Sequence, residues 1–167
     1  TLTLATVLSL AFSQASAQDF FKGVNAYKAG DYATAMKEFQ PLAELGDADA
    51  QIKLGIMYEY GLGVVKDATN AAKWYRQAAE HGNAFSQYKL GLMYNEGTGV
   101  LQDYAKALKW YQLSADQGNK TAQALLGLMY EEGNGVLKDN VTAHMWYNIA
   151  SANGHESAGR HRDKLAA

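Results

Sequence analysis

The chain has no cysteine, and this excludes a disulfide, a thiolate metal site and a cysteine nucleophile. It has a single proline among its 167 residues, which suits a helix-rich chain. Neither sign of charge dominates, since 15 Lys and Arg face 17 Asp and Glu for a net charge of −2. Sequence-independent binding to nucleic acid needs a basic excess, so we expect no nucleic-acid partner.

Groupings of residues that carry catalysis or hold metals are also missing. The chain has four histidines, and none has a metal-type spacing to another histidine or to a carboxylate pair on one helix face. Glu131 and Glu132 are adjacent, so on a helix they point about 100° apart. We therefore expect no catalytic, cofactor-binding or metal-binding residues, and a chain that is not an enzyme. The histidines are His81, His144, His155 and His161.

The N-terminal segment differs from the rest because it carries no charge before Asp19. An apolar run from Leu2 to Phe12 leads into Ala15-Ser16-Ala17, a small-residue pattern typical of signal-peptide cleavage. The alternative is a first buried helix of the fold. We expect residues 1–17 to be a signal peptide truncated at its start, cleaved near Ala17-Gln18. The mature protein would then be periplasmic or secreted, without membrane insertion.

The rest of the chain is dominated by a period of 36 residues. Three units follow one another at 48–83, 84–119 and 120–155, and 13 of the 36 positions are identical in all three. A fixed period of this length is typical of stacked repeats. Each unit predicts two helices, A and B, because apolar residues recur at one-turn spacing on both sides of a central turn. The identical positions in the first unit are Gln51, Leu54, Gly55, Met57, Tyr58, Gly61, Gly63, Val64, Asp67, Ala71, Trp74, Tyr75 and Gly82.

The glycines of each unit have separate explanations. Gly97 and Gly99 resemble a phosphate loop, but they recur in every unit and lack the preceding strand and Gly-Lys-Ser/Thr of such loops. We expect them to form the turn between helices A and B at positive φ, with Val100 and Leu101 tucked beneath it. Gly55 lies inside helix A, where glycine costs about 1 kcal/mol relative to alanine. We expect an aromatic ring of helix B to lie where its Cβ would be.

The repeated pattern A-x-x-x-L-G-x-M-Y-x-x-G-x-G-V-x-x-D-x-x-x-A-x-x-W-Y resembles the Sel1-like repeat, a relative of the tetratricopeptide repeat. The resemblance implies an all-α, right-handed superhelical solenoid of antiparallel helix pairs. Residues 18–47 resemble a degenerate tetratricopeptide unit, and we expect 156–167 to be a capping helix with a polar outer face. Since the chain lacks cysteine, the penicillin-binding activity proposed for the cysteine-rich branch of the family is not carried over.

The resemblance also implies that the A helices line a concave groove. Side chains outside the repeat signature that point into this groove are then the candidate protein-binding residues. They combine aromatic and aliphatic groups with a line of glutamates, so we expect a partner segment that is basic and partly apolar. The alternative is that the glutamates only solvate helix ends and the tyrosines complete the core. The predicted groove residues are Tyr27, Lys28, Ile56, Glu59, Tyr60, Phe85, Tyr88, Leu92, Asn95, Glu96, Leu128, Glu131 and Glu132.

Three functions remain open at this point. The first is a protein-binding scaffold, adaptor or regulator in the bacterial envelope, as the family resemblance implies. The second is a periplasmic immunity protein that neutralises an antibacterial toxin such as a phospholipase effector. The third is a hydrolase of cell-wall or β-lactam substrates, which would need turnover that depends on Glu131 or Glu132. A homodimer formed through the open ends of the stack is also compatible with a repeat architecture.

Overall fold

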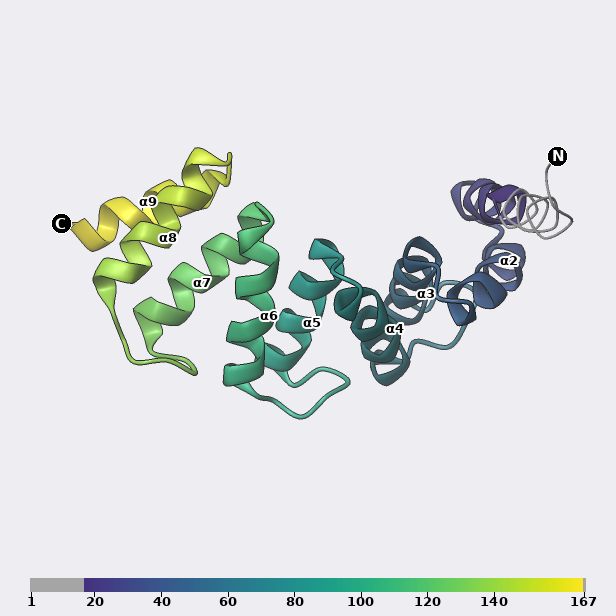
Figure 1. Ribbon diagram of the computed structural model, residues 1–167, viewed down its shortest axis with the longest axis horizontal. Coiled ribbons are helices and arrows are strands. Elements are labelled where there is room, and N and C mark those ends of the chain that lie inside the picture. Colours follow the sequence, from purple (N-terminus) through teal and green to yellow (C-terminus); the bar gives the residue numbers. More distant parts are fainter. Residues whose placement is uncertain (1–16, 167) are drawn as a thin grey trace, which may run out of the picture. The chain divides into compact units, whose positions relative to one another are not determined.

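The computed structural model describes residues 17–166, and every regular element among them is a helix (Figure 1). The expected signal peptide therefore lies outside the described residues, apart from Ala17. A helical segment at 17–28 comes first. The helices that follow are α2 (Tyr32–Glu44), α3 (Ala48–Tyr60), α4 (Ala68–Glu80), α5 (Ala84–Glu96), α6 (Tyr104–Asp116), α7 (Lys120–Glu132), α8 (Asn140–Ala152) and α9 (Glu156–Ala166). None of these helices is long and apolar enough to cross a membrane.

Each of the three repeats contributes the two helices that its sequence predicts. Helices α3, α5 and α7 are the A helices, and α4, α6 and α8 are the B helices. Within the C-terminal part of the chain, each helix from α5 to α9 packs against the next one along the sequence (Figure 1). The prediction of an all-helical fold built from helix pairs is confirmed.

The start of each B helix is fixed by an aspartate, as its position before the helix indicates. In the first repeat, the Asp67 carboxylate accepts hydrogen bonds from the backbone amides of Thr69 and Asn70 at 2.9 and 3.0 Å. These amides have no partner within the helix, so the carboxylate satisfies them and complements the positive end of the helix dipole. The amide of Asn70 is the main reason that the pKa of Asp67 lies below its usual value.

The turns between A and B helices take the left-handed backbone that their glycines permit. Gly97 and Gly99 both have φ of +71°, and the Gly97 amide donates to the Met93 carbonyl to close α5. The predicted burial beneath the turn is half right. Val100 is half-buried, but Leu101 is 90% exposed. The segment is anchored after the turn, where the Asp103 amide donates to the Tyr94 carbonyl at 2.9 Å.

The described residues divide into two compact units, 17–77 and 78–166, with the division inside α4. In the first unit, α2 and α3 surround a core that contains the buried side chains of Phe39 and Leu54 and is completed by Trp74 of α4. In the second unit, the main core joins α5, α6 and α7 around Leu90, Tyr111 and Leu126. A smaller cluster joins α8 to α9.

Helix pairs approach closely where the A helix carries its glycine. A Cβ added to Gly55 would lie 2.6 Å from the ring of Tyr75, closer than real Cβ atoms approach other atoms. The predicted close approach is thus confirmed, and the ring is that of the repeated tyrosine. The same contact recurs between Gly91 and Tyr111 at 2.6 Å and between Gly127 and Tyr147 at 2.7 Å.

Successive repeats are joined by a buried glutamine at the start of each A helix. The side-chain amide of Gln123 donates to the Ala115 carbonyl at 3.0 Å, near the end of the preceding B helix. Its oxygen accepts from the side-chain amide of Asn153 at 2.9 Å. The last carbonyls of a helix lack intrahelical partners, so this side chain satisfies one of them inside the core. Gln51 and Gln87 bind Ala43 and Ala79 in the same way.

Candidate protein-binding groove

The two predicted groove residues at the N-terminal end lie at the end of the helical segment 17–28. Tyr27 is half-buried, and its ring meets that of Tyr32 edge-on at 5.4 Å. The Lys53 ammonium lies 5.3 Å from the centre of the same ring, a cation–π arrangement. Burial raises the pKa of Tyr27. Lys28 is exposed. The structure therefore gives Tyr27 an internal packing role and leaves Lys28 on the surface.

On α3, the predicted groove residues differ in exposure. Ile56 is half-buried, whereas Tyr60 is 62% exposed at the end of the helix. Glu59 accepts a hydrogen bond from the Tyr75 hydroxyl at 2.6 Å. Tyr75 itself is completely buried, so this carboxylate satisfies a hydroxyl from the core. Glu59 therefore stabilises the packing of α4 on α3, in addition to any role it has at the surface.

On α5, the predicted residues form a mixed aromatic and polar surface. Phe85 is 40% exposed, and its ring meets that of the half-buried Tyr88 edge-on at 6.3 Å. Leu92 packs against the main core of the second unit. Asn95 is half-buried and Glu96 is exposed at the end of the helix. The helix thus carries partly exposed rings near its start and an exposed carboxylate at its end, and their role in binding stays a prediction.

On α7, the two adjacent glutamates have separate roles. Glu131 accepts a hydrogen bond from the Tyr147 hydroxyl at 2.7 Å, which repeats the pair formed by Glu59. Glu132 is exposed and accepts from the Asn134 side-chain amide at 2.6 Å. Leu128, one turn before them, is half-buried and lines a pocket. The predicted acidic line therefore consists of two carboxylates bonded to core tyrosines and two, Glu96 and Glu132, at the surface.

The middle repeat lacks the tyrosine–glutamate pair of its neighbours. Asn95 stands where the other repeats have Glu59 and Glu131. The Tyr111 hydroxyl is buried without a hydrogen-bond partner among the described residues. Burial raises the pKa of Tyr111, and nearby Tyr88 and Glu96 raise it further. An unpaired hydroxyl in the core is costly, so the middle repeat is less well satisfied than the other two.

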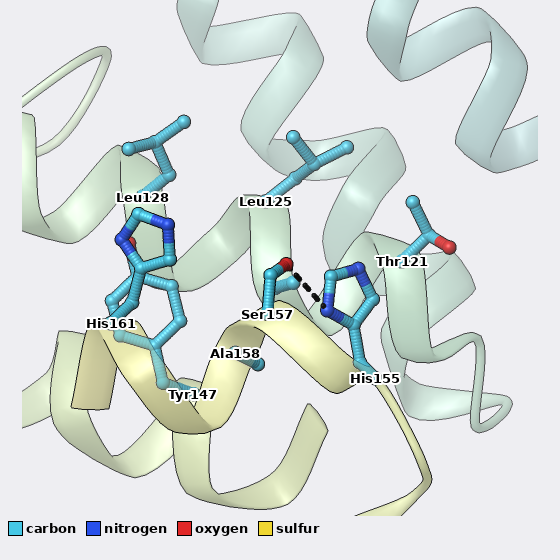
Figure 2. A pocket seen from close by; sticks show the side chains of 9 residues that line it. Thr121, Leu125, Leu128, Tyr147, His155, Ser157, Ala158 and His161 are labelled. Atoms are coloured by element: carbon cyan, nitrogen blue, oxygen red, sulfur yellow. Dashed lines mark hydrogen bonds between the residues drawn. The ribbon is translucent and has the colours of Figure 1, made fainter. Parts of the chain in front are cut away.

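A pocket of about 150 Å³ lies between α7 and α9 (Figure 2). One wall is α7, with Leu125 and Leu128, and the other is formed by His161 of α9 and by His155, which directly precedes α9. The ring of His161 stacks on that of Tyr147, with centroids 5.2 Å apart and planes 27° from parallel. Thr121, Ala124, Ser157 and Ala158 complete the lining.

The pocket is lined by apolar side chains together with a serine, a threonine and two histidines. The Ser157 hydroxyl lies 3.3 Å from Nδ1 of His155, two residues earlier in the chain. A serine nucleophile needs a histidine that a third group orients, and no carboxylate is among the residues that line this pocket. The lining is mostly apolar with a few polar groups at the edge, which is typical of sites that hold a side chain or a small apolar group.

A second hollow of about 290 Å³ lies along α6, where Tyr130 of α7 adjoins it. Its lining includes Leu108, Lys109, Gln112 and Leu113, which are B-helix residues. It contains none of the predicted groove residues, so it serves as a reference surface for experiments on the A helices.

Sequence reasoning located Leu128 but missed the other residues of the α7–α9 pocket. The signal was nevertheless present in the 36-residue register. Thr121 and Ala124 occupy the positions of Phe85 and Tyr88 in the preceding repeat. Extending the register into the capping helix aligns His161 with Leu125. Comparing the predicted groove positions of successive repeats would have shown that the rings of Phe85 and Tyr88 are replaced by the small side chains of Thr121 and Ala124.

Comparisons with known proteins agree with this architecture. The Sel1 repeat model matches residues 48–83, 84–119 and 120–155. Among solved structures, a Sel1 repeat protein from Oxalobacter formigenes is 37% identical with a TM-score of 0.78, and the match covers 83% of this chain and 57% of that one. The protective antigen c5321 of uropathogenic Escherichia coli, which displays an SLR fold, is 36% identical with a TM-score of 0.83.

That second match covers 95% of this chain and 35% of the antigen, so the chain spans about a third to just over half of these two relatives. The cysteine-rich protein B of Helicobacter pylori shares the fold at 21% identity and a TM-score of 0.60, over 77% of this chain and 92% of that one. No curated protein matches the chain significantly.

Three matched repeats cover more than half of the chain, and the helix pairs show the corresponding fold. Proteins built from such repeats generally act as non-enzymatic scaffolds that bind other proteins. The chain belongs to the Sel1 repeat family and has its all-α solenoid fold.

Proposed function

We propose that this protein is a binding scaffold of the bacterial envelope, and that its partner is a protein segment that binds the A helices of the second compact unit, α5 and α7. The observation that carries the proposal is the combination on α5 of partly exposed rings at Phe85 and Tyr88 with the exposed carboxylate of Glu96. Aromatic side chains are preferred anchors in protein interfaces, and a carboxylate at the end of the same helix favours a partner that also carries a cationic group.

The rest of the predicted surface supports the same kind of partner. Within the second unit, Glu132 on α7 is an exposed carboxylate at the end of an A helix, as Glu96 is on α5. In the first unit, Tyr60 is an exposed ring at the end of α3. Glu59 and Glu131 are held in place by buried tyrosine hydroxyls, so their carboxylates are positioned before any partner arrives. A preorganised charge loses little side-chain entropy on binding.

A crosslinking capture experiment tests the site. The variant Tyr60→Ala/Tyr88→Ala/Glu96→Lys changes the A helices. Its matched control Leu113→Ala/Met145→Ala/Glu80→Lys makes the same types of change at exposed B-helix positions. We expect wild type and the control to capture the same periplasmic protein and the A-helix variant to lose it. Loss by the control alone would place the site on the B helices and contradict the proposal. Capture of a foreign toxin would favour an immunity role.

The proposed location has its own test. The apolar run from Leu2 to Phe12 and the small residues before Gln18 support export. We expect the protein from its native cell to fractionate with the periplasm or the medium and to begin at Gln18 on N-terminal sequencing. Recovery in the cytoplasm with residues 1–17 attached would contradict export without affecting the binding proposal.

A further inference from the structure

We propose that the α7–α9 pocket receives one aromatic side chain of the partner segment, the size of a phenylalanine ring, with a basic residue of the same segment beside Glu131 and Glu132. This inference rests on the proposed function, because it specifies what part of the partner is bound and where. It concerns the second compact unit alone, so it depends on contacts among α7, α8 and α9.

The volume of the pocket suits one ring. An apolar cavity of about 150 Å³ in another protein binds benzene, and the present pocket has about the same volume. A methyl group would leave most of this space empty and forfeit dispersion contacts along the walls. An indole would exceed it. A phenyl side chain therefore matches the space better than a smaller or larger group.

The register of the repeats shows why this space exists. In the second repeat, the rings of Phe85 and Tyr88 contact each other on the A helix. The equivalent positions of the third repeat hold Thr121 and Ala124, and both line the pocket. The chain supplies its own rings in one repeat and leaves room for them in the next. A partner's ring would occupy the space that these small residues leave.

The walls are suited to the faces and edges of an aromatic ring. Leu125 and Leu128 provide an apolar wall from α7, and His161 provides a flat one from α9 (Figure 2). His161 is held in position by stacking on Tyr147. Aromatic rings that meet in offset-stacked or edge-to-face arrangements attract each other beyond what the burial of their area provides.

Carboxylates near one end of the pocket indicate the charge of the partner. Tyr147 lines the pocket, and its hydroxyl holds the Glu131 carboxylate at 2.7 Å. A carboxylate has about four lone-pair sites, so Glu131 keeps capacity for a cation after accepting this bond. Glu132 and the negative end of the α7 dipole lie at the same helix terminus. An arginine or lysine close to the aromatic residue would meet these groups.

The test uses a pocket-filling variant and a displayed library of random dodecapeptides selected on the full chain. Thr121→Phe installs the residue that the second repeat has at this position, so the helix is expected to tolerate it. Gln112→Phe adds the same ring to the α6 hollow as the matched control. Thermal melts of both variants check that they remain folded. Fluorescence anisotropy then measures the affinity of a labelled selected peptide.

We expect the selected peptides to share an aromatic residue with Arg or Lys nearby. Replacing that aromatic residue by alanine, or using Thr121→Phe, should weaken binding about tenfold or more, as for an interface anchor. Gln112→Phe should leave the affinity unchanged, and Glu132→Lys should weaken it.

Peptides that bind equally well to Thr121→Phe, or that share only aliphatic anchors, would overturn the pocket inference. If such peptides still lost binding to the Tyr60→Ala/Tyr88→Ala/Glu96→Lys variant, the proposed function would stand without it. Failure to select any peptide would also overturn the pocket inference, and the capture experiment would then decide the proposed function independently.

Discussion

The repeated tyrosine of helix B has the same ring environment in all three repeats but two kinds of hydroxyl environment. Tyr75 and Tyr147 donate to carboxylates, and Tyr111 donates to no described residue. A hydrogen bond to a charged acceptor contributes about 1.5–3 kcal/mol, whereas an unsatisfied buried hydroxyl costs about 1–3 kcal/mol. Removing the hydroxyl should therefore have different effects at equivalent positions.

Tyr147→Phe and Tyr111→Phe test this difference with the same chemical change. Tyr147→Phe should lower the free energy of unfolding by about 1.5–2 kcal/mol, the lower part of the range for charged acceptors, because Glu131 is half-exposed and water can replace the bond. Tyr111→Phe should be neutral or stabilising. Urea denaturation of the two variants and wild type measures both. Equal destabilisation would show that the Tyr111 hydroxyl has a partner in solution.

Asn95→Glu tests whether the missing carboxylate explains the unpaired hydroxyl. The substitution restores the residue of the other repeats, so we expect a gain of about 1 kcal/mol in the free energy of unfolding. In a Tyr111→Phe background this gain in stability should vanish, because the new carboxylate at position 95 then has no hydroxyl from which to accept a hydrogen bond. This double-mutant cycle isolates the pair from other effects of the new charge. A gain that persists without the hydroxyl would assign it to another contact.

At the scale of the helices, the interior glycine sets how closely A and B helices pack. Gly91→Ala should lower the free energy of unfolding by about 1–3 kcal/mol, because the new Cβ would lie 2.6 Å from the buried Tyr111 ring. The Tyr111 ring is completely buried, so it has no free space into which it could move away from the new Cβ. Thermal or urea unfolding of the purified variant gives the change.

Gly159→Ala is the control for the helical backbone. This glycine also lies inside a helix, α9, but an added Cβ would meet only the small side chain of Ser151, whose hydroxyl oxygen would be nearest at 3.1 Å. Alanine is the better helix former by about 1 kcal/mol, so this variant should be neutral or stabilised. If Gly91→Ala were equally harmless, the close packing of α5 on α6 would not be the reason for its glycine.

At the scale of the whole chain, the features shared by all three repeats could be predicted from the sequence. The features that differ between repeats could not. The helix ranges, the aspartate caps and the glycine–aromatic contact all follow from the 36-residue period, because identical residues meet identical local demands. The tyrosine–glutamate pairs were missed, although Glu59 and Tyr75 keep the same 16-residue separation as Glu131 and Tyr147. The α7–α9 pocket was missed because it depends on small side chains facing a capping helix that departs from the repeat.

The last prediction concerns the response of the whole chain to alkaline pH. Burial raises the pKa of Tyr75, Tyr111 and Tyr147 above the ordinary value of about 10. Above pH 10 the unfolded chain loses these protons and the folded chain keeps them. The folded state then binds more protons, so the free energy of unfolding falls as pH rises. Their contribution is fully present below pH 10.

Urea denaturation at intervals from pH 9 to 11.5 measures the slope. Each fully retained proton contributes about 1.4 kcal/mol per pH unit. Tyr75→Phe or Tyr111→Phe should reduce the slope by up to one proton, even though their effects on stability at neutral pH differ. Tyr60→Phe is the control, because Tyr60 is mostly exposed. If the stability of wild type and of the two core variants fell with the same slope, the Tyr75 and Tyr111 hydroxyls would ionise in the folded chain as they do in the unfolded chain. That result would contradict the prediction that burial keeps them protonated.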